Sequence, residues 1–424
     1  MQERKLMIEH KQNIERFILV AAQKKQFEEA EAWESLEELS ELVKTAGGEV
    51  IMHVLQRVDR INPGLYIGSG KADEIKELIH IHGATGVVFD DELSPIQMRN
   101  LAEALEVKIM DRTMIILDIF ASRARSKEGK LQIEMAQLKY QSSRLIGFGT
   151  MLSRQAGGIG SRGPGEKKLE LDKRHLRTRM EILEKELKEV EKHRQLIRER
   201  RKKNSTPVVA IVGYTNAGKS TLLNQLSGSE VYVQNQLFAT LDPTTRAVTL
   251  PSGSEILLTD TVGFIRKLPH HLIKAFYSTL EEAKYADIIL HVMDISSPHI
   301  LTHQQIVYET LERLKISGVP IIAIYNKADQ YDGIYPKDEH ADYEVKISAK
   351  TGLGCDNLLE TIEQILYANM KPFEIEVPYA NGDVVRFCHE FGERLEEEYT
   401  NEGVHLKGFI PADKFYKIEP WILS

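Results

Sequence analysis

The chain has 424 residues, of which 42% are hydrophobic and 28% charged, so it is long enough for about three domains of ~150 residues and too apolar to be mainly disordered. Its two cysteines have no paired CxxC spacing, which excludes a cysteine zinc site, and its apolar runs are far shorter than the ~20 residues of a membrane span, so we expect a soluble, cytoplasmic protein. The net charge is −8, yet residues 123–203 hold 23 Lys and Arg against 11 Asp and Glu, which leaves −20 on the rest.

Residues 1–122 alternate short apolar runs with helical stretches. The runs EVIMHVL and GVVFDD are typical of buried strands, and ADEIKELIHIH between them is typical of a helix. Strands that alternate with helices form parallel sheets with helices on their faces. The sequence therefore predicts a small parallel α/β domain here.

Residues 123–204 follow a helical pattern instead. Apolar residues that recur every seven positions predict two long helices that pair as an antiparallel hairpin. Because the segment is basic, we expect it to meet phosphate, although the mixed Lys and Glu residues of 181–203 alone are more typical of a solvated helical surface. Apolar residues recur every seven positions on both sides of a glycine-rich break: Leu131, Leu138, Leu145, Leu169, Leu176, Leu183, Val190 and Ile197.

The glycine-rich break, IGFGTMLSRQAGGIGSRGPGEKK over residues 146–168, lies at the tip of the predicted hairpin. Its glycines allow close backbone approach, and its Arg groups can pair with phosphate or stack on bases. A flexible linker is the alternative, but linkers seldom carry Arg, Gln and Pro at such spacing. The predicted RNA-contacting residues are Arg154, Gln155, Arg162, Lys167 and Lys168.

The motif GYTNAGKS, Gly213–Ser220, follows the strand-like run VVAIV and precedes the helical run STLLNQL. It matches the phosphate-binding loop GxxxxGK[ST] in its strand, loop, helix context. Backbone N–H groups of such a loop curl around the β-phosphate, Lys219 bridges β- and γ-oxygens, and the Ser220 hydroxyl ligates Mg²⁺. The predicted nucleotide contacts are Gly213, Tyr214, Thr215, Asn216, Ala217, Gly218, Lys219, Ser220 and Thr221, with Lys219 also catalytic.

Guanine is the predicted base, because NKAD follows the apolar strand PIIAIY. The Asp329 carboxylate can accept hydrogen bonds from both N1–H and the N2 amine of guanine, which adenine does not offer. After the next strand, SAK brings the Ala349 N–H within reach of guanine O6. The predicted base-binding residues are Asn326, Lys327, Ala328, Asp329, Ser348, Ala349 and Lys350.

Two switch segments lie between these motifs. In DTVG, Asp260 is expected to hold Mg²⁺ through water, and the Gly263 N–H is expected to sense the γ-phosphate as a catalytic group. The segment FATLDPTTR offers Thr240, Thr244 and Thr245 for the threonine that caps Mg²⁺, and we favour Thr240. The predicted switch residues are Phe238, Ala239, Thr240, Leu241, Asp242, Asp260, Thr261, Val262 and Gly263.

Catalysis departs from the Ras-type pattern. Phe264 follows DTVG where those GTPases carry the glutamine that orients the attacking water. We therefore expect slow intrinsic hydrolysis, with a partner or a rearranged switch that supplies the missing group. Asn216 is the predicted ligand of a monovalent cation, K⁺, beside the phosphates, and a capping or turn residue is the alternative.

The remaining segments complete the domain plan. Strands and helices alternate again up to residue 371, and the tail beyond it carries the strand-like FEIEVPY and a helix near VVRFCHEF. The predicted fold class is α/β, with a P-loop GTPase domain preceded by a small parallel α/β domain with an antiparallel helical hairpin and followed by a small α+β C-terminal domain. The predicted domains are 1–122, 123–204, 205–371 and 372–424.

With these motifs the chain resembles the HflX family of GTPases. GYTNAGKS, FATLDPTTR, DTVGFI and NKAD match its GTPase block, and RLIGFGTMLSRQAGGIGSRGPGE matches its glycine-rich signature. The resemblance implies a ribosome-associated, translation-factor-like GTPase that binds the large ribosomal subunit, with the N-terminal block and the hairpin tip directed at ribosomal RNA near the peptidyl transferase region. It also implies a role in splitting or rescuing stalled ribosomes or in subunit biogenesis.

Two other classes of function fit parts of the pattern. A GTP-gated partner in RNA modification would need a cofactor site, commonly a cysteine or a folate pocket, and none is apparent in the sequence. A small-molecule kinase would use the phosphate loop, but NKAD and DTVG argue against it. We expect a monomer that binds GTP and GDP. A peripheral membrane association, ATP binding by the N-terminal block and the role of the tail stay open.

Overall fold

The computed structural model divides into two compact units. The first comprises Met1–Arg123, Ile133–Leu183 and Lys267–His271, and the second comprises Ala124–Gln132, Glu184–Arg266 and Leu272–Ser424. The residues that the structure describes are 14–25, 28–155, 164–203, 206–228, 237–238, 243–268, 282–331, 333, 335–368 and 370–423.

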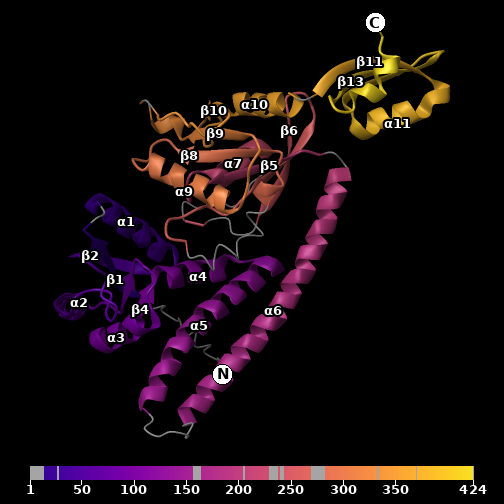
Figure 1. Cartoon of the computed structure of the whole chain (residues 1–424). Helices are drawn as coiled ribbons and strands as arrows, with labels where there is room; N and C mark the ends of the chain where they lie inside the picture. The colour runs from indigo at the N-terminus through magenta and orange to yellow at the C-terminus, as the bar shows by residue number, and fades with distance from the viewer. Residues whose placement is uncertain are drawn as a thin grey trace, which may run out of the picture. The chain divides into compact units, whose positions relative to one another are not determined.

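The first unit is built on a four-stranded parallel sheet in the order β2-β1-β3-β4 (Figure 1). The parallel α/β fold predicted from the alternation of strands and helices is confirmed. The strands are β1 (Arg16–Lys24), β2 (Glu49–Val58), β3 (Gly86–Phe89) and β4 (Lys108–Asp111). The helices between and after them are α1 (Glu29–Thr45), α2 (Ser69–His82), α3 (Pro95–Leu105) and α4 (Arg112–Arg123).

Helices cover both faces of this sheet, because successive strand residues point to opposite sides. On one side Ile18 and Phe89 form a core with Ile75 of α2 and Leu101 of α3. Leu19 points to the other side and is also fully buried. There α1 packs on β1 and β2 and contacts α4. Burial on both faces explains why the strands read as continuous apolar runs.

Asp111, the last residue of β4, fixes the helix α5 (Lys127–Gln155) to this sheet. Its two carboxylate oxygens each lie 2.8 Å from the Tyr140 hydroxyl, and Arg144 donates to the carboxylate at 2.7 Å. The backbone N–H groups of Leu93 and Met114 donate at 3.1 and 3.0 Å. Burial and the charge of Asp111 raise the pKa of Tyr140, so the phenol keeps its proton. The fully buried carboxylate is therefore well compensated.

The helices α5 and α6 (Pro164–Lys203) form the predicted antiparallel hairpin. Arg179 pairs with Glu134 at 2.6 Å, and Arg194 pairs with Glu128. From the first ion pair to the second, the residue number in α5 falls while that in α6 rises, as it does in antiparallel helices. Leu183, one of the heptad residues, is fully buried. The fold class predicted for this segment is confirmed.

The structure differs from the expected glycine-rich loop in one respect. Helix α5 continues through Gly147 and Gly149 and ends at Gln155, so that the first part of the break is helical. A helix that is already formed extends at little cost, and each internal glycine disfavours it by only about 1 kcal/mol. Residues 156–163 lie outside the described residues.

The second unit holds a six-stranded sheet in the order β10-β9-β8-β5-β7-β6, parallel except for the edge strand β6. Gly213, Asp260, Asp294 and Asn326 end β5, β7, β8 and β9, so one edge of the sheet gathers the ends of the motifs. The strands are β5 (Val208–Gly213), β6 (Thr244–Thr249), β7 (Glu255–Asp260), β8 (Ile288–Asp294), β9 (Ile321–Asn326) and β10 (Tyr343–Lys346). The helical segments are α7 (Lys219–Ser227), α9 (Ile300–Arg313), η1 (Ala328–Gln330) and α10 (Cys355–Tyr367).

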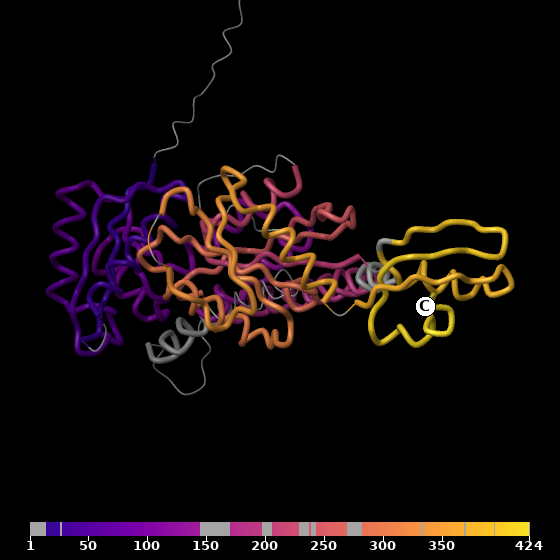
Figure 2. The backbone as a smooth tube through the Cα atoms, turned by 90° about the horizontal axis from the view of Figure 1, so that it is seen from above, coloured from indigo at the N-terminus to yellow at the C-terminus, as the bar shows by residue number. Residues whose placement is uncertain are grey.

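The tail forms a three-stranded antiparallel sheet in the order β11-β13-β12, whose strands β11 and β13 run side by side in yellow in Figure 2. Ile375, Leu406 and the α11 residue Cys388 are fully buried in its core. The predicted small α+β domain is confirmed. Its elements are β11 (Met370–Pro378), η2 (Tyr379–Asn381), α11 (Gly382–Phe391), β12 (Glu393–Tyr399), β13 (Gly403–Pro411), η3 (Phe415–Lys417) and η4 (Glu419–Trp421).

In the part of the chain that the structure describes, no helix combines the length and the apolar character needed to cross a membrane.

We predict that Asp111→Ala lowers the free energy of unfolding by about 3 to 5 kcal/mol, because it leaves Arg144 and the Tyr140 hydroxyl without their buried acceptor. Tyr140→Phe removes one donor only and should cost about 1 kcal/mol. Chemical denaturation followed by circular dichroism measures both. Equal losses in the two variants would show that the carboxylate does not hold α5.

Candidate nucleotide site

The phosphate-binding loop needs glycine at two positions for different reasons. A Cβ at Gly213 would lie 2.3 Å from the backbone oxygen of Val292, so the loop leaves β5 too close to β8 for a side chain. Gly218 has φ of 99°, and a Cβ there would lie 2.2 Å from Nδ2 of Asn326. The loop therefore turns tightly onto the start of α7, whose backbone N–H groups suit an anion.

Lys219 lies buried in this loop with 7% of its surface exposed. Its ammonium donates a hydrogen bond to the backbone oxygen of Tyr214 at 2.8 Å. Burial lowers the pKa of Lys219 to about 8, although the charge of Asp260 opposes the shift. A phosphate group placed in the loop would supply the counter-charge that burial removes.

The oxygen atoms expected to hold Mg²⁺ lie together. The Ser220 hydroxyl donates to the Asp260 carboxylate at 2.7 Å. Asp260 is fully buried at the end of β7. A hydroxyl beside a carboxylate is a hard oxygen donor set that suits Mg²⁺, which fills its other positions with water and phosphate oxygens. Among the described residues no group of three or more His, Cys, Asp or Glu forms a separate metal site.

The DTVG segment packs directly on the phosphate loop. A Cβ at Gly263 would lie 2.8 Å from Cγ2 of Thr215 and 2.9 Å from Nζ of Lys219, so only glycine fits. The next residue, Phe264, accepts a hydrogen bond from the Thr215 N–H at 2.8 Å and donates to the oxygen of Gly213 at 3.1 Å. Its side chain is 2% exposed. A buried apolar ring here cannot orient water.

The side-chain amide of Asn326 joins the phosphate loop to the SAK loop. Its Nδ2 donates to the oxygen of Ala217 at 2.8 Å, and its Oδ1 accepts from the N–H of Ala349 at 2.9 Å. Lys327 donates to Asp294 at the end of β8, at 2.6 Å. These contacts hold NKAD and SAK against each other.

Asp329 stands exposed at the end of this arrangement, in η1. Hydrogen bonding from Ser348 holds the pKa of Asp329 below its usual value, so the carboxylate is ionised at neutral pH. A fixed, ionised carboxylate is an acceptor for both N–H groups on the guanine edge.

Three family models match the chain in succession. Residues 33–121 match "GTP-binding GTPase N-terminal", residues 123–201 match "GTP-binding GTPase Middle Region", and residues 208–327 match "50S ribosome-binding GTPase". The chain is 52% identical to the GTPase HflX of Lacrimispora saccharolytica over 410 residues, which cover 96% of each protein. The chain belongs to the HflX family of GTPases. It binds guanine nucleotide and hydrolyses GTP.

Other HflX relatives show similar coverage. The GTPase HflX of Caldanaerobacter subterraneus is 50% identical, over 97% of this chain and 94% of that protein. The Escherichia coli GTPase HflX is 40% identical, over 87% of each. The fold class and the family predicted from the sequence are both confirmed.

The first switch of this HflX chain is described only in part. Phe238 is buried with φ of 56°, whereas Ala239, Thr240, Leu241 and Asp242 lie outside the described residues. The other two threonines considered for Mg²⁺ belong to β6. Thr244 lies opposite Asp260 in the sheet, and the Thr245 hydroxyl is hydrogen-bonded to that of Thr259 at 3.0 Å.

Asn216 is exposed at the turn of the phosphate loop and has φ of 62°, a conformation that Asn tolerates better than most residues. Its side chain is therefore accessible from solvent. Thr261, from DTVG, has a structural contact, since its hydroxyl donates a hydrogen bond to the backbone oxygen of Ile211 in β5 at 2.7 Å.

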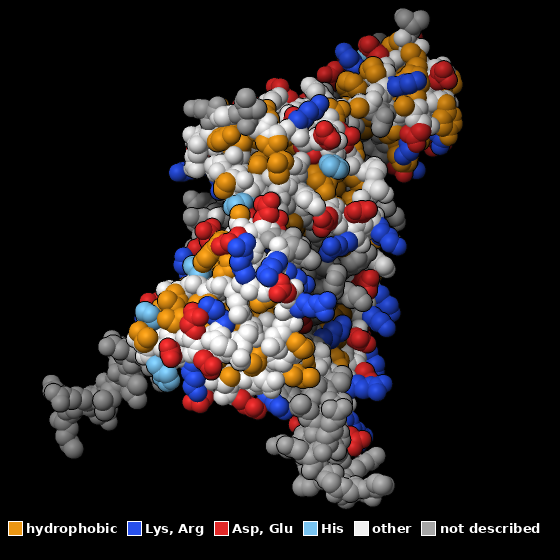
Figure 3. All heavy atoms as spheres, turned by 60° about the vertical axis from the view of Figure 1, so that its left-hand side comes forward, with side chains coloured by type: hydrophobic (Ala, Val, Ile, Leu, Met, Phe, Trp, Pro, Cys, Tyr) orange, Lys and Arg blue, Asp and Glu red, His pale blue; other side chains and the backbone are white. Residues whose placement is uncertain are grey.

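The residues predicted to contact RNA lie near the ends of α5 and α6. Arg154 and Gln155 form the last residues of α5, and Lys167 and Lys168 belong to the first turns of α6. Their side chains, and the whole of Arg162, lie outside the described residues. Figure 3 shows Lys and Arg side chains, among Asp and Glu, along the right-hand edge of the face that it presents.

Sequence analysis missed a ring stack beside the phosphate loop. The rings of Tyr214 and His303 lie 3.8 Å apart between centroids, with 10° between their planes. The Tyr214 hydroxyl accepts from the backbone N–H of Arg266 at 3.0 Å. Burial, helped by the charge of Arg266, lowers the pKa of His303 to about 4, so the ring is neutral at pH 7. No motif marks His303 as a partner of the loop.

We predict that the stabilising contribution of this stack is lost in acid, where the His303 ring becomes protonated. Because the folded pKa of His303 lies below the unfolded value of about 6.5, its contribution is complete above pH 6.5 and is lost as the pH falls toward 4. His303→Phe keeps the stack without the titration and should lose less stability over this range. Denaturation midpoints at pH 7, 6 and 5 measure the difference. Identical profiles for parent and variant would exclude the buried neutral imidazole.

Proposed function

We propose that this protein is a GTP-dependent factor of the large ribosomal subunit that acts in ribosome splitting, rescue or subunit biogenesis. The observation that carries the proposal is the pairing, in one chain, of a guanine-nucleotide site with a basic hairpin. That hairpin segment, residues 123–203, carries a net charge of +12 in a chain of net charge −8. The match of residues 208–327 to the "50S ribosome-binding GTPase" model supports the same partner.

In the proposed site, Lys219 and the N–H groups of its loop bind the phosphates, while Asp329 recognises guanine. Ser220, Asp260 through water, and Thr240 would hold Mg²⁺, which neutralises negative charge on the phosphate oxygens. This assignment is supported by the 2.7 Å contact between the Ser220 and Asp260 side chains.

Hydrolysis needs a group that this chain lacks next to DTVG. The Gly263 N–H contacts the γ-phosphate in the proposed mechanism, but the Phe264 ring is buried and cannot orient the attacking water. Isolated protein should therefore turn over slowly. The ribosome supplies the group that orients the attacking water. K⁺ held by Asn216 beside the phosphates would add positive charge.

RNA binding is assigned to the ends of the hairpin. Arg154, Gln155, Arg162, Lys167 and Lys168 belong to the most glycine-rich part of the basic segment. Contacts of Arg and Lys with phosphate release counterions, so binding should be steeply salt-dependent.

We predict that Asp329→Asn changes the base preference from guanine to xanthine. An amide donates where the carboxylate accepted, and xanthine carries an oxygen in place of the N2 amine. GTP affinity should fall by about 100-fold or more, and xanthosine triphosphate should become the better ligand. Isothermal titration calorimetry with both nucleotides, on parent and variant, tests this. Unchanged GTP affinity would mean that another residue recognises the base.

We also predict that purified large ribosomal subunits accelerate GTP turnover at least tenfold, which corresponds to an activation barrier lower by about 1.4 kcal/mol.

The double variant Arg154→Ala with Arg162→Ala should weaken subunit binding by about 1 to 3 kcal/mol per lost contact without a change in GTP affinity. Cosedimentation with a non-hydrolysable GTP analogue over a salt series measures binding, and phosphate release measures turnover.

Lys219→Ala is the control that must abolish turnover with and without subunits. Fast turnover by the isolated protein would contradict the catalytic part of the proposal. If the double Arg variant binds subunits as well as the parent at every salt concentration, the RNA-binding part is wrong.

A further inference from the structure

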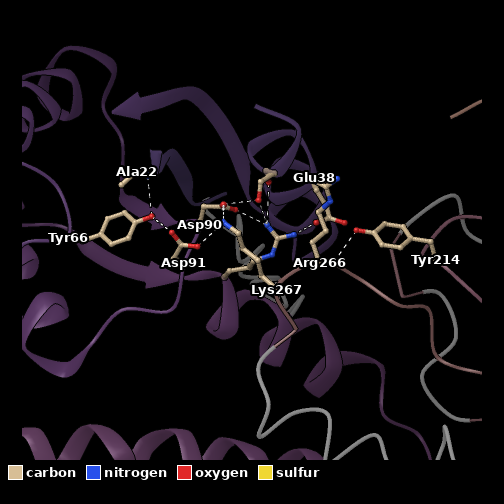
Figure 4. A network of polar contacts seen from close by, with 10 residues as sticks. Ala22, Glu38, Tyr66, Asp90, Asp91, Tyr214, Arg266 and Lys267 are labelled. Atoms are coloured by element: carbon tan, nitrogen blue, oxygen red, sulfur yellow. Dashed lines mark hydrogen bonds and ion pairs between the residues drawn. The ribbon is translucent and has the colours of Figure 1, made fainter. Parts of the chain in front are cut away.

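Tyr214, the second residue of the phosphate loop, is fixed through both its backbone and its hydroxyl. Its backbone oxygen accepts hydrogen bonds from the Lys219 ammonium at 2.8 Å and from the Ala217 N–H at 3.3 Å. Its hydroxyl accepts from the Arg266 N–H at 3.0 Å, a contact that Figure 4 shows at the tip of the Tyr214 ring. Tyr214 is 6% exposed. The position of Tyr214 therefore affects where the Lys219 ammonium lies.

The face of the Tyr214 ring is covered by His303 of α9. The two ring centroids are 3.8 Å apart and the ring planes differ by 10°, so the rings touch face to face. Helix α9 is held independently of the loop, because it packs on β5 and β8 and buries Val307 and Leu311. His303 therefore attaches the start of the phosphate loop to the packed core of this unit.

The phosphate loop has a second attachment further along. There the Asn326 amide donates to the backbone oxygen of Ala217 at 2.8 Å. Asn326 belongs to NKAD, which the sequence marks as a GTP motif, whereas His303 belongs to no such motif. Two residues, Thr215 and Asn216, separate Tyr214 from Ala217, so the two attachments together leave this part of the loop little freedom.

The His303 ring affects the loop through its position and not through charge. Burial, helped by the charge of Arg266, lowers the pKa of His303 to about 4, so the ring is neutral at pH 7. A neutral ring neither attracts the phosphates nor competes with them for Lys219. Another flat ring of similar size should therefore have the same effect on Tyr214.

We propose that His303 is a positioning residue for the phosphate loop: its stack on Tyr214 fixes the backbone oxygen that holds Lys219, and so keeps the Lys219 ammonium where the β- and γ-phosphates bind. This rests on the role of Lys219 in the proposed function. Without the stack, Tyr214 adopts further positions, and only a fraction of the molecules holds Lys219 in place before the nucleotide binds. The apparent dissociation constant rises by the inverse of that fraction.

The test is isothermal titration calorimetry of the full chain at pH 7, with GDP and with a non-hydrolysable GTP analogue, in the absence of ribosomes. His303→Ala should weaken the binding of both nucleotides about threefold to tenfold, because both contain the β-phosphate. His303→Gln also lacks a ring but leaves a smaller cavity, and it should give a similar loss. His303→Phe keeps a flat ring and should stay within about twofold of the parent.

A double-mutant cycle with Lys219→Ala separates positioning from a general effect on the fold. If His303 acts through Lys219, adding His303→Ala to Lys219→Ala should cause little further loss of affinity. A general effect would weaken binding by the same factor in the presence and in the absence of Lys219. If Lys219→Ala alone binds both nucleotides like the parent, the role of Lys219 in the proposed function is wrong and this inference fails with it. That failure is recognised without any His303 variant.

His340→Ala is the matched control. His340 stacks on Tyr308 of the same helix, with ring centroids 4.7 Å apart and 29° between the planes, but this stack includes no residue of the phosphate loop. The variant should bind both nucleotides like the parent. The proposal fails if His303→Ala and His303→Gln bind like the parent, if His303→Phe loses as much affinity as His303→Ala, or if the His303 and Lys219 effects add. Since ribosomes are absent, these outcomes are independent of whether the large subunit is the partner.

Discussion

The two hydrogen bonds of the Asn326 amide are the constraint on which the nucleotide site depends. One goes to the oxygen of Ala217 in the phosphate loop and the other to the N–H of Ala349 in the SAK loop. Asn326 is 3% exposed, so without it two backbone groups would stay buried and unpaired, at about 1 to 3 kcal/mol each. The amide also leaves no room for a Cβ at Gly218. Base recognition and phosphate binding are therefore parts of one packed arrangement.

Much of this could be predicted because each motif follows a buried strand. The ends of parallel strands meet at one edge, so residues far apart in sequence, such as Ser220 and Asp260, are brought together by topology alone. Strand alternation likewise predicted the small parallel sheet, and the heptad spacing predicted the hairpin. In each case the prediction used a feature of a short stretch of sequence: the spacing of apolar residues, the type of residue at a turn, or the position at which a strand ends.

What could not be predicted depends on packing between distant segments. The stack of Tyr214 on His303 joins a loop to α9, yet His303 has no spacing that distinguishes it from an exposed helical histidine. Asp111 and Tyr140 are equally unmarked in the sequence. The helical state of Gly147 and Gly149 was missed for a different reason, since glycine count describes local preference, whereas a helix already formed over the preceding residues extends through it.

The two parallel sheets use the same edge in different ways. In the second unit the carboxyl ends of β5 and β7 lead into loops whose glycines and N–H groups suit an anion. In the first unit β3 ends in Asp90 and Asp91, which select a cation, and the cation present is Lys267. The residues that directly follow the strands therefore decide which charge the carboxyl edge of a sheet accepts. Asp90 also pairs with the buried Arg112, so its carboxylate is part of the fold of the first unit, and removing it would leave the Arg112 charge buried without this partner.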